Sequence, residues 1–146
     1  MSDVTLFWSL YDAALNGDFD AAAELIDDAC EYVMMPTMEV SRGKPAVLKA
    51  MGRGAGAFDR TRPPTITFDV ATSEWGVFEF VNEGTVATGI VDFAVNSDWQ
   101  FSVEPSSLVG HSYRAPVCMV YQINVQRKIY RIHEYTDVAS LMKSIR

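Results

Sequence analysis

Cysteine and histidine are scarce in this sequence. Its 146 residues include two cysteines, Cys30 and Cys118, and two histidines, His111 and His133. The cysteines are far apart and form no Cys-x-x-Cys motif, so we expect two reduced thiols rather than a disulfide framework. With so few soft ligands, we expect no zinc or other metal site and no cofactor.

Positive charge is also in short supply. Twelve Lys and Arg residues face nineteen Asp and Glu residues, which gives a net charge of −7. The basic residues are scattered along the chain. We therefore expect no nucleic-acid partner, because nucleic-acid phosphates need a basic surface.

Long hydrophobic runs are absent. No stretch approaches the roughly 20 apolar residues of a membrane span, and the amino terminus Met-Ser-Asp-Val-Thr lacks a basic region followed by an apolar run. We therefore expect a cytoplasmic protein that does not contact a membrane. The length predicts one domain over residues 1–146, large enough for a core and a ligand-sized cavity.

Helical patterns come first in the chain. Apolar residues at three- and four-residue spacing predict a helix over 4–16, and Asp18 is the expected cap of a second helix over 19–26. A third helix is predicted over 45–51, ended by Gly52, Gly54 and Gly56. A short helix over 138–145, capped by Asp137, is expected to close the chain.

Strand patterns fill most of the remainder. The predicted strands are 29–35, 66–73 (half-buried), 77–81, 85–95, 117–125 and 129–137. Asn82-Glu83-Gly84 is a favourable hairpin turn. Residues 96–112 are rich in Ser, Asn and Pro but include Trp99, so we interpret them as a loop that folds over an apolar pocket as a lid.

The order of these elements predicts an α+β fold. Helices followed by a run of antiparallel strands are typical of a curved sheet with helices on one face. Such a sheet forms a cone, and its wide end leaves an apolar pocket where a small ligand commonly binds.

Glu134 is the most unusual residue of the last predicted strand. A two-residue period puts it on one face with Tyr130, Ile132 and Thr136, the less polar side of the strand. A carboxyl group there is either paired structurally, with Arg131 or a backbone amide, or has a shifted pKa and a chemical role.

Asp92 is the second candidate acid. On the predicted strand 85–95 it shares a face with Thr88 and Ile90. If Asp92 and Glu134 both point into an apolar cone, burial and repulsion raise at least one pKa, so that one donates a proton while the other acts as a base. The alternative is that Asp92 faces solvent near a strand end.

Three short sequence motifs support a resemblance to a known family. They are residues 15–20 (Leu-Asn-Gly-Asp-Phe-Asp), 42–47 (Arg-Gly-Lys-Pro-Ala-Val) and 129–137 (Ile-Tyr-Arg-Ile-His-Glu-Tyr-Thr-Asp). With the order of elements, they resemble the nuclear transport factor 2-like superfamily in its SnoaL-like and limonene epoxide hydrolase branches. The resemblance implies a cone-shaped fold, a small apolar ligand and a homodimer formed through the convex sheet face.

The epoxide hydrolase branch resembles this chain at its catalytic motifs. Tyr32 matches the tyrosine of the branch, whereas Met34 stands where the branch has its water-holding asparagine. Asp92 and Glu134 fall where the two catalytic acids of the branch stand, but Ile90 replaces its arginine. In the ketosteroid isomerase branch, Met35 would replace the proton-shuttling aspartate, and Tyr11 lies near the helix tyrosine.

The candidate site therefore has two groups of residues. Asp92, Glu134 and Tyr32 are the proposed catalytic residues, although a sheet tyrosine is as often a packed ring. The expected substrate-binding residues are Met34, Ile90, Tyr11, Trp99, His111 and Met119. For the methionines the alternative is ordinary core filling, and for His111 a loop position without function.

Two functions are compatible with this sequence. The first is a cofactor-independent acid–base enzyme acting on a small apolar molecule by epoxide hydrolysis, cyclisation or isomerisation. The second is a non-catalytic ligand-binding or dimerisation domain of the same fold, in which the acids are structural. The paired-acid enzyme requires both carboxyl groups in one closed pocket, whereas the binding domain does not.

Overall fold

The fold was analysed in a computed structural model that describes residues 3–146. Its helices are α1 (Asp3–Leu15), α2 (Phe19–Leu25), α3 (Lys44–Ala57), α4 (Ile90–Val95), the 3-10 helix η1 (Pro105–Leu108) and α5 (Val138–Ser144). Its strands are β1 (Ile26–Met34), β2 (Glu39–Arg42), β3 (Phe58–Arg60), β4 (Thr65–Ala71), β5 (Trp75–Val86), β6 (Ser112–Ile123) and β7 (Ile129–Thr136). No helix within the described range is both long and apolar enough to cross a membrane.

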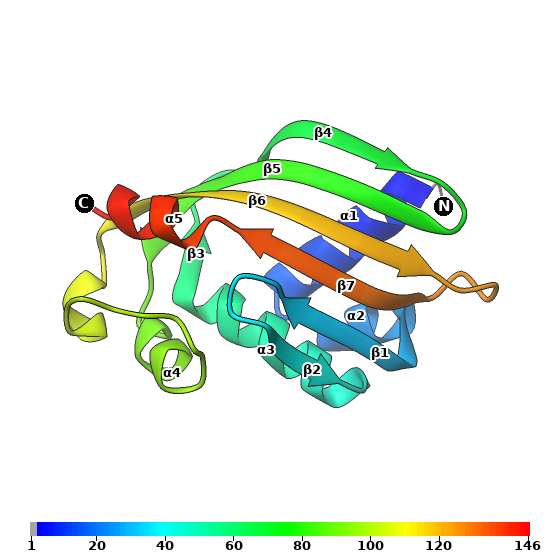
Figure 1. Cartoon of the computed structure of the whole chain (residues 1–146), viewed down its shortest axis with the longest axis horizontal. Helices are drawn as coiled ribbons and strands as arrows, with labels where there is room; N and C mark the ends of the chain where they lie inside the picture. The colour runs from blue at the N-terminus through cyan, green and yellow to red at the C-terminus, as the bar shows by residue number, and fades with distance from the viewer. Residues whose placement is uncertain (1–2) are drawn as a thin grey trace.

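All seven strands form one curled sheet in the order β2-β1-β7-β6-β5-β3 (Figure 1). Strands β1 and β7 are parallel, and the other pairs are antiparallel. The outer edge of β5 is shared, because β4 pairs with its first part and β3 with its end. This mixed α+β architecture, with a strongly curved sheet, confirms the predicted cone-shaped fold class.

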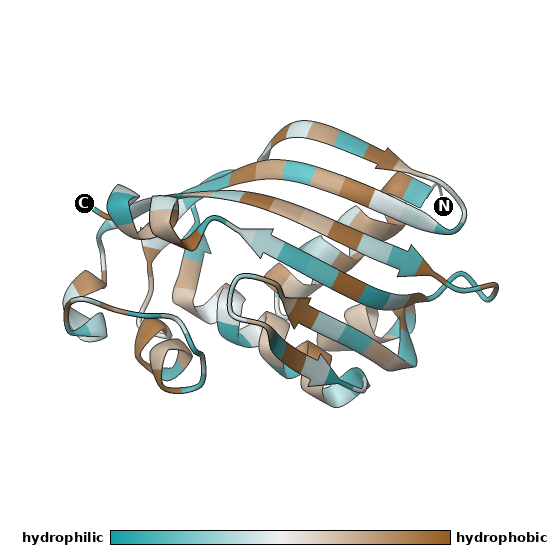
Figure 2. Cartoon of the chain, in the orientation of Figure 1, coloured by the Kyte–Doolittle hydropathy of each residue, from teal (hydrophilic) through white to brown (hydrophobic). Residues whose placement is uncertain are grey.

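The helices α1, α2 and α3 lie on one side of the sheet (Figure 1). Phe7 of α1 stacks on Phe78 of β5 with 3.9 Å between ring centroids, and Tyr121 of β6 continues the stack at 5.7 Å from Phe7. Hydropathy alternates along the long strands in Figure 2, as expected when one sheet face packs on helices. The aromatic stack packs α1 against β5 and β6.

The two predicted helix caps are present. The Asp18 carboxylate accepts a hydrogen bond from the Ala21 amide at 3.1 Å, and the Asp137 carboxylate accepts one from the Ser140 amide at 2.9 Å. Each bond satisfies an amide that the first helical turn leaves without a partner. The starts of α2 and α5 were therefore correctly predicted from local sequence.

The predicted hairpin turn at residues 82–84 is wrong. Strand β5 runs unbroken from Trp75 to Val86 and pairs with β6 throughout. Gly84 serves close approach instead: a Cβ atom there would lie 1.8 Å from the carbonyl oxygen of Asp59 in β3. The glycine therefore lets β3 pair closely with β5. The side chain of Asn82 points inward, toward Tyr11.

The predicted strand over 85–95 is wrong in its second half. Residues Ile90–Val95 form α4, whereas the alternation of apolar residues had favoured a strand. The glycines of α3 also do not end that helix, which continues to Ala57. A Cβ at Gly52 would lie 2.9 Å from the ring of Phe19, so this glycine makes room for α2.

The predicted strand over 66–73 exists as β4, but it is not half-buried. Its residues Thr65–Val70 are exposed, and a register shift between Ile66 and Phe68 moves the later apolar side chains to the outer face. Strands β2 and β3, which have four and three residues, were not predicted. Strands this short carry almost no periodic signal.

Candidate functional site

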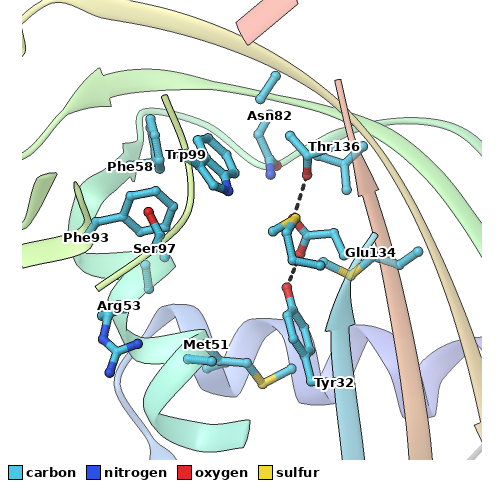
Figure 3. Close-up of a pocket in the computed structure, with 18 of the residues that line it drawn as sticks. Tyr32, Met51, Arg53, Phe58, Asn82, Phe93, Ser97, Trp99, Glu134 and Thr136 are labelled. Atoms are coloured by element: carbon cyan, nitrogen blue, oxygen red, sulfur yellow. Dashed lines mark hydrogen bonds between the residues drawn. The ribbon is translucent and has the colours of Figure 1, made fainter. Parts of the chain in front are cut away.

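A cavity of about 170 Å³ opens between the concave sheet face and helices α1, α3 and α4. The close-up in Figure 3 shows Glu134, Tyr32 and Thr136 on one side and an aromatic wall of Phe58, Phe93 and Trp99 on the other. The lining also includes Tyr11, Ala14, Leu15, Met34, Glu39, Ser41, Ala50, Met51, Arg53, Gly54, Ala55, Arg60, Asn82, Asn96, Ser97, Tyr113, Ala115, Val117, Met119 and Leu141. Most of these side chains are apolar.

Glu134 lies at the polar end of the cavity. The Tyr32 hydroxyl donates a hydrogen bond to its Oε1, and Thr136 Oγ1 donates one to its Oε2 at 2.5 Å (Figure 3). Its neighbours in register are Met34 on β1 and Met119 on β6. The part of the Glu134 carboxyl that makes no hydrogen bond faces the cavity rather than bulk solvent.

This environment raises the pKa of Glu134 above its ordinary value. Burial is the main cause, because the charged carboxylate loses its hydration. The hydrogen bonds from Thr136 and Tyr32, and the charge of Arg60, oppose the shift by stabilising the carboxylate. The pKa of the Tyr32 phenol is raised well above 10.0 by burial and by the adjacent Glu134, so Tyr32 is a neutral donor.

A second polar cluster lies beside the first. Tyr11 of α1 donates a hydrogen bond from its hydroxyl to Asn82 Oδ1 at 2.8 Å, and Arg60 Nε donates to the Tyr11 oxygen at 3.0 Å. The Arg60 guanidinium carbon also lies 5.2 Å from the centre of the Tyr11 ring. Burial raises the pKa of Tyr11 despite the opposing charge of Arg60. These three residues form a fixed donor–acceptor chain at the cavity wall.

The opposite wall is aromatic. Phe93 of α4 contacts Trp99 edge-on with 4.8 Å between ring centroids, and Phe58 of β3 contacts Phe93 edge-on at 5.6 Å. All three rings are buried. The cavity therefore has an apolar aromatic wall opposite a carboxyl group that accepts hydrogen bonds from two hydroxyls.

Several predicted residues do come together in this cavity. Glu134 and Tyr32 are hydrogen-bonded, and the predicted substrate-binding residues Met34, Tyr11 and Trp99 line the same space. Met119 also lines it. Their catalytic and binding roles remain proposals.

The predicted partnership of Asp92 with Glu134 is wrong. Asp92 lies in α4, not on a strand, and its side chain is 68% exposed. Its carboxylate accepts a hydrogen bond from Asn96 Nδ2 at 3.0 Å and lies 3.9 Å from Arg53 Nε. Asp92 is not among the lining residues, because the helical turn directs Ile90 and Phe93 inward and Asp92 outward.

Two further predicted binding residues lie elsewhere. Ile90 is fully buried but packs in the core rather than along the cavity, and His111 is exposed and does not line it. Of the predicted lid over 96–112, the first part lines the cavity, through Asn96, Ser97 and Trp99. His111 follows η1, where the chain turns into β6.

Thr136, Arg60, Asn82 and Glu39 are polar residues of the site that were not predicted from the sequence. Thr136 shared the predicted face of Glu134, so alternation already carried its signal. Arg60 lies on the unpredicted β3, and Asn82 was assigned to a turn. Glu39 at the start of β2 is a second carboxyl in the lining, and it accepts a hydrogen bond from Thr37 at 2.6 Å.

Side chains suited to metals do not gather in this structure. Between residues 3 and 146, no group of three His, Cys, Asp or Glu side chains is arranged to hold a metal ion. Burial raises the pKa of Cys30 to about 12, so this thiol is an unreactive core group.

Known proteins resemble this chain in structure rather than in sequence. No protein-family model and no curated protein sequence matches it. A provisionally named polyketide cyclase from Pseudomonas putida KT2440 superposes with a TM-score of 0.71 and 17% identity, over 100% of this chain and 99% of that chain.

Two other solved structures give the same result. A nuclear transport factor 2-like protein from Burkholderia xenovorans LB400 has a TM-score of 0.67 and 16% identity, over 100% of this chain and 99% of that chain. An epoxide hydrolase from M. tuberculosis, of the limonene epoxide hydrolase-like type, has a TM-score of 0.67 and 16% identity, over 97% of this chain and 87% of that chain. The chain thus has the nuclear transport factor 2-like fold, as its sequence motifs had predicted.

Proposed function

We propose that this protein is a cofactor-independent enzyme that moves a proton on a small, largely apolar molecule, with Glu134 as the proton-exchanging group. The observation that carries the proposal is the Glu134 carboxyl, which sits in an apolar cavity and accepts hydrogen bonds from Tyr32 and Thr136. Burial raises the pKa of this group above its ordinary value, which makes the carboxyl a stronger base than an exposed glutamate.

The chemistry that suits this arrangement uses one acid. As a carboxylate, Glu134 accepts a proton from a carbon of the bound molecule on a free lone pair, while Tyr32 and Thr136 hold its orientation. As an acid, Glu134 returns the proton to another atom of the same molecule. Isomerisation and cyclisation follow this pattern, whereas hydrolysis of an epoxide by two acids would require the second carboxyl that Asp92 does not supply.

A non-catalytic ligand-binding domain of the same fold is the second candidate. It is favoured by the position of Asp92, since the expected pair of acids does not form in the cavity. In that case Tyr32 and Thr136 simply satisfy a buried carboxyl, and the cavity only binds its ligand.

The two candidates differ in proton exchange. Proton NMR in D₂O would follow a panel of small enolisable ketones, lactones and epoxides with the wild-type protein. We expect loss of signal at an acidic C–H position or product formation, and a decrease of about 100-fold or more in Glu134→Gln. Glu74→Gln, at an exposed position in the turn before β5, is the matched control. Equal rates in wild type and Glu134→Gln would favour the binding domain.

We also propose a homodimer through the convex sheet face. The strand registers align Val70, Val77, Val120 and His133 as one row across four strands on that face. Phe68 and Tyr135 extend the apolar surface and are 54% and 46% exposed. The resemblance in the sequence implies this assembly, and a second copy would cover these side chains.

A further inference from the structure

Arg60 brings a positive charge to the cavity and, within residues 3–146, forms no ion pair with a carboxylate. It lines the cavity from β3, on the same strand face as Phe58. The ion pairs of residues 3–146 involve Arg42, Lys44, Arg53, Arg62, Arg114 and Arg127, and Arg60 is in none of them. Arg60 is half-buried, and an anion that enters this mostly apolar space could form charge-assisted hydrogen bonds with its guanidinium.

The other arginine of the lining is already neutralised. Arg53 Nε lies 3.9 Å from the Asp92 carboxylate, on the outer side of α4. The two carboxyls of the lining do not pair with Arg60 either, because Glu39 bonds Thr37 and Glu134 bonds Tyr32 and Thr136. Among the described residues, Arg60 is therefore the arginine of the lining that forms no ion pair.

Only some of the N–H donors of the Arg60 guanidinium have hydrogen-bond partners among the described residues. Its Nε donates to Tyr11, and its Nη1 makes only a long bond of 3.4 Å to the Phe58 carbonyl. The remaining N–H groups have no partner among the described residues. Arginine presents such groups as a planar fork that matches the two oxygens of a carboxylate.

Nearby polar groups favour an anion at this point. Arg60 Nε contacts the Tyr11 hydroxyl at 3.0 Å, and Tyr113 lines the same cavity. The Tyr113 side chain is buried, and its hydroxyl has no hydrogen-bond partner in the described structure. Burial raises the pKa of Tyr113 to about 12, so it stays a neutral donor.

We propose that the natural ligand is a small carboxylic acid whose carboxylate binds Arg60 while its apolar body lies against Phe58, Phe93 and Trp99. The cavity of about 170 Å³ sets the size, because an engineered cavity of about 150 Å³ holds one benzene ring. The body is therefore one ring or a short branched chain. This inference rests on the proposed function only in using the same cavity, and it names the class of substrate that Glu134 would act on.

Benzoate and benzamide test the proposal, since they differ mainly in charge. The probe is the Arg60 Nε–H resonance in proton–nitrogen NMR spectra, titrated with each compound. We expect benzoate to bind the wild type about 10- to 100-fold more tightly than benzamide, as hydrogen bonds to a charged group provide. In Arg60→Gln, followed through backbone amide shifts around Trp99, this preference should disappear.

Arg62→Gln is the matched control. It removes the same charge two residues along the chain, where the side chain is 61% exposed and pairs with Glu83 outside the cavity. The benzoate preference should survive in Arg62→Gln. Equal binding of the two compounds, a preference that persists in Arg60→Gln, or no saturable shift with benzoate would overturn the proposal.

The outcome is separable from that of the proposed function. Loss of proton exchange in Glu134→Gln, together with no benzoate preference, would support the acid–base enzyme and reject the carboxylate ligand. The reverse result would support a carboxylate-binding domain without catalysis.

Discussion

The Tyr32 hydroxyl donates a hydrogen bond to the Glu134 carboxylate from the neighbouring parallel strand. Both side chains reach the concave sheet face because Tyr32 pairs in register with Ile132, two residues before Glu134. The two residues are 102 positions apart in the sequence. Strand pairing therefore creates the polar end of the cavity. Four predictions test the ionisation of Glu134, the packing of β3 beside the cavity and the proposed dimer.

Tyr32→Phe should raise the pKa of Glu134 further. The Tyr32 bond stabilises the carboxylate, so its loss favours the protonated form. The carboxyl carbon shift of Glu134 in NMR spectra, followed against pH, measures the change. Tyr135→Phe removes an equivalent hydroxyl from the outer face of the same strand and should leave the Glu134 titration unchanged. A lower pKa in Tyr32→Phe would contradict the hydrogen-bond direction.

The stability of the wild type should depend on pH through Glu134. The folded-state pKa lies above the unfolded one, so the folded state binds the extra proton. This contribution is complete below the unfolded pKa of about 4.3 and is lost as the pH rises through the folded pKa.

Urea unfolding from acid to neutral pH would measure this effect. The free energy of unfolding of the wild type relative to Glu134→Gln should fall over that window, since glutamine does not ionise. A flat difference across the window would show that Glu134 titrates normally. Glu74→Gln serves again as the exposed control.

Gly84→Ala should destabilise the protein by about 2–4 kcal/mol. The added Cβ would meet the Asp59 carbonyl oxygen at 1.8 Å, which forces β3 away from β5 and displaces Arg60 from the cavity. Gly54→Ala is the control, because nothing lies within 4 Å of its Cβ position and alanine in a helix gains about 0.5–1 kcal/mol. Thermal or urea unfolding of both variants gives the comparison.

Val120→Asp should dissociate the proposed dimer. Val120 lies in the centre of the convex row, where a buried charge would oppose association. Sedimentation velocity should show a wild-type dimer and a Val120→Asp monomer. Val125→Asp, at a position that is 97% exposed in the turn before β7, should remain dimeric. A monomeric wild type would reject the assembly.

Local sequence predicted much of the fold correctly. The amphipathic pattern of α1, the caps of α2 and α5, and the two-residue period of β7 each depend on neighbouring residues alone. The same period placed Glu134 and Thr136 on one face, and the family motifs indicated the cone. The predictions failed where tertiary contacts set the conformation. Gly84 is needed for the close approach of β3, and Gly52 makes room for the Phe19 ring. Helix α4 forms where the alternation of apolar residues favoured a strand.

The sequence by itself determined that Glu134 stands on an apolar strand face, because alternation in a strand is a property of the backbone. Only the tertiary structure decided which groups meet that carboxyl. The pairing of β1 with β7 places Tyr32 beside Glu134, and the pairing of β3 with β5 places Arg60 in the same cavity. The helical conformation of α4 directs Asp92 to solvent. Contacts between distant segments depend on how a sheet curls and how elements pack, and no local pattern encodes those distances.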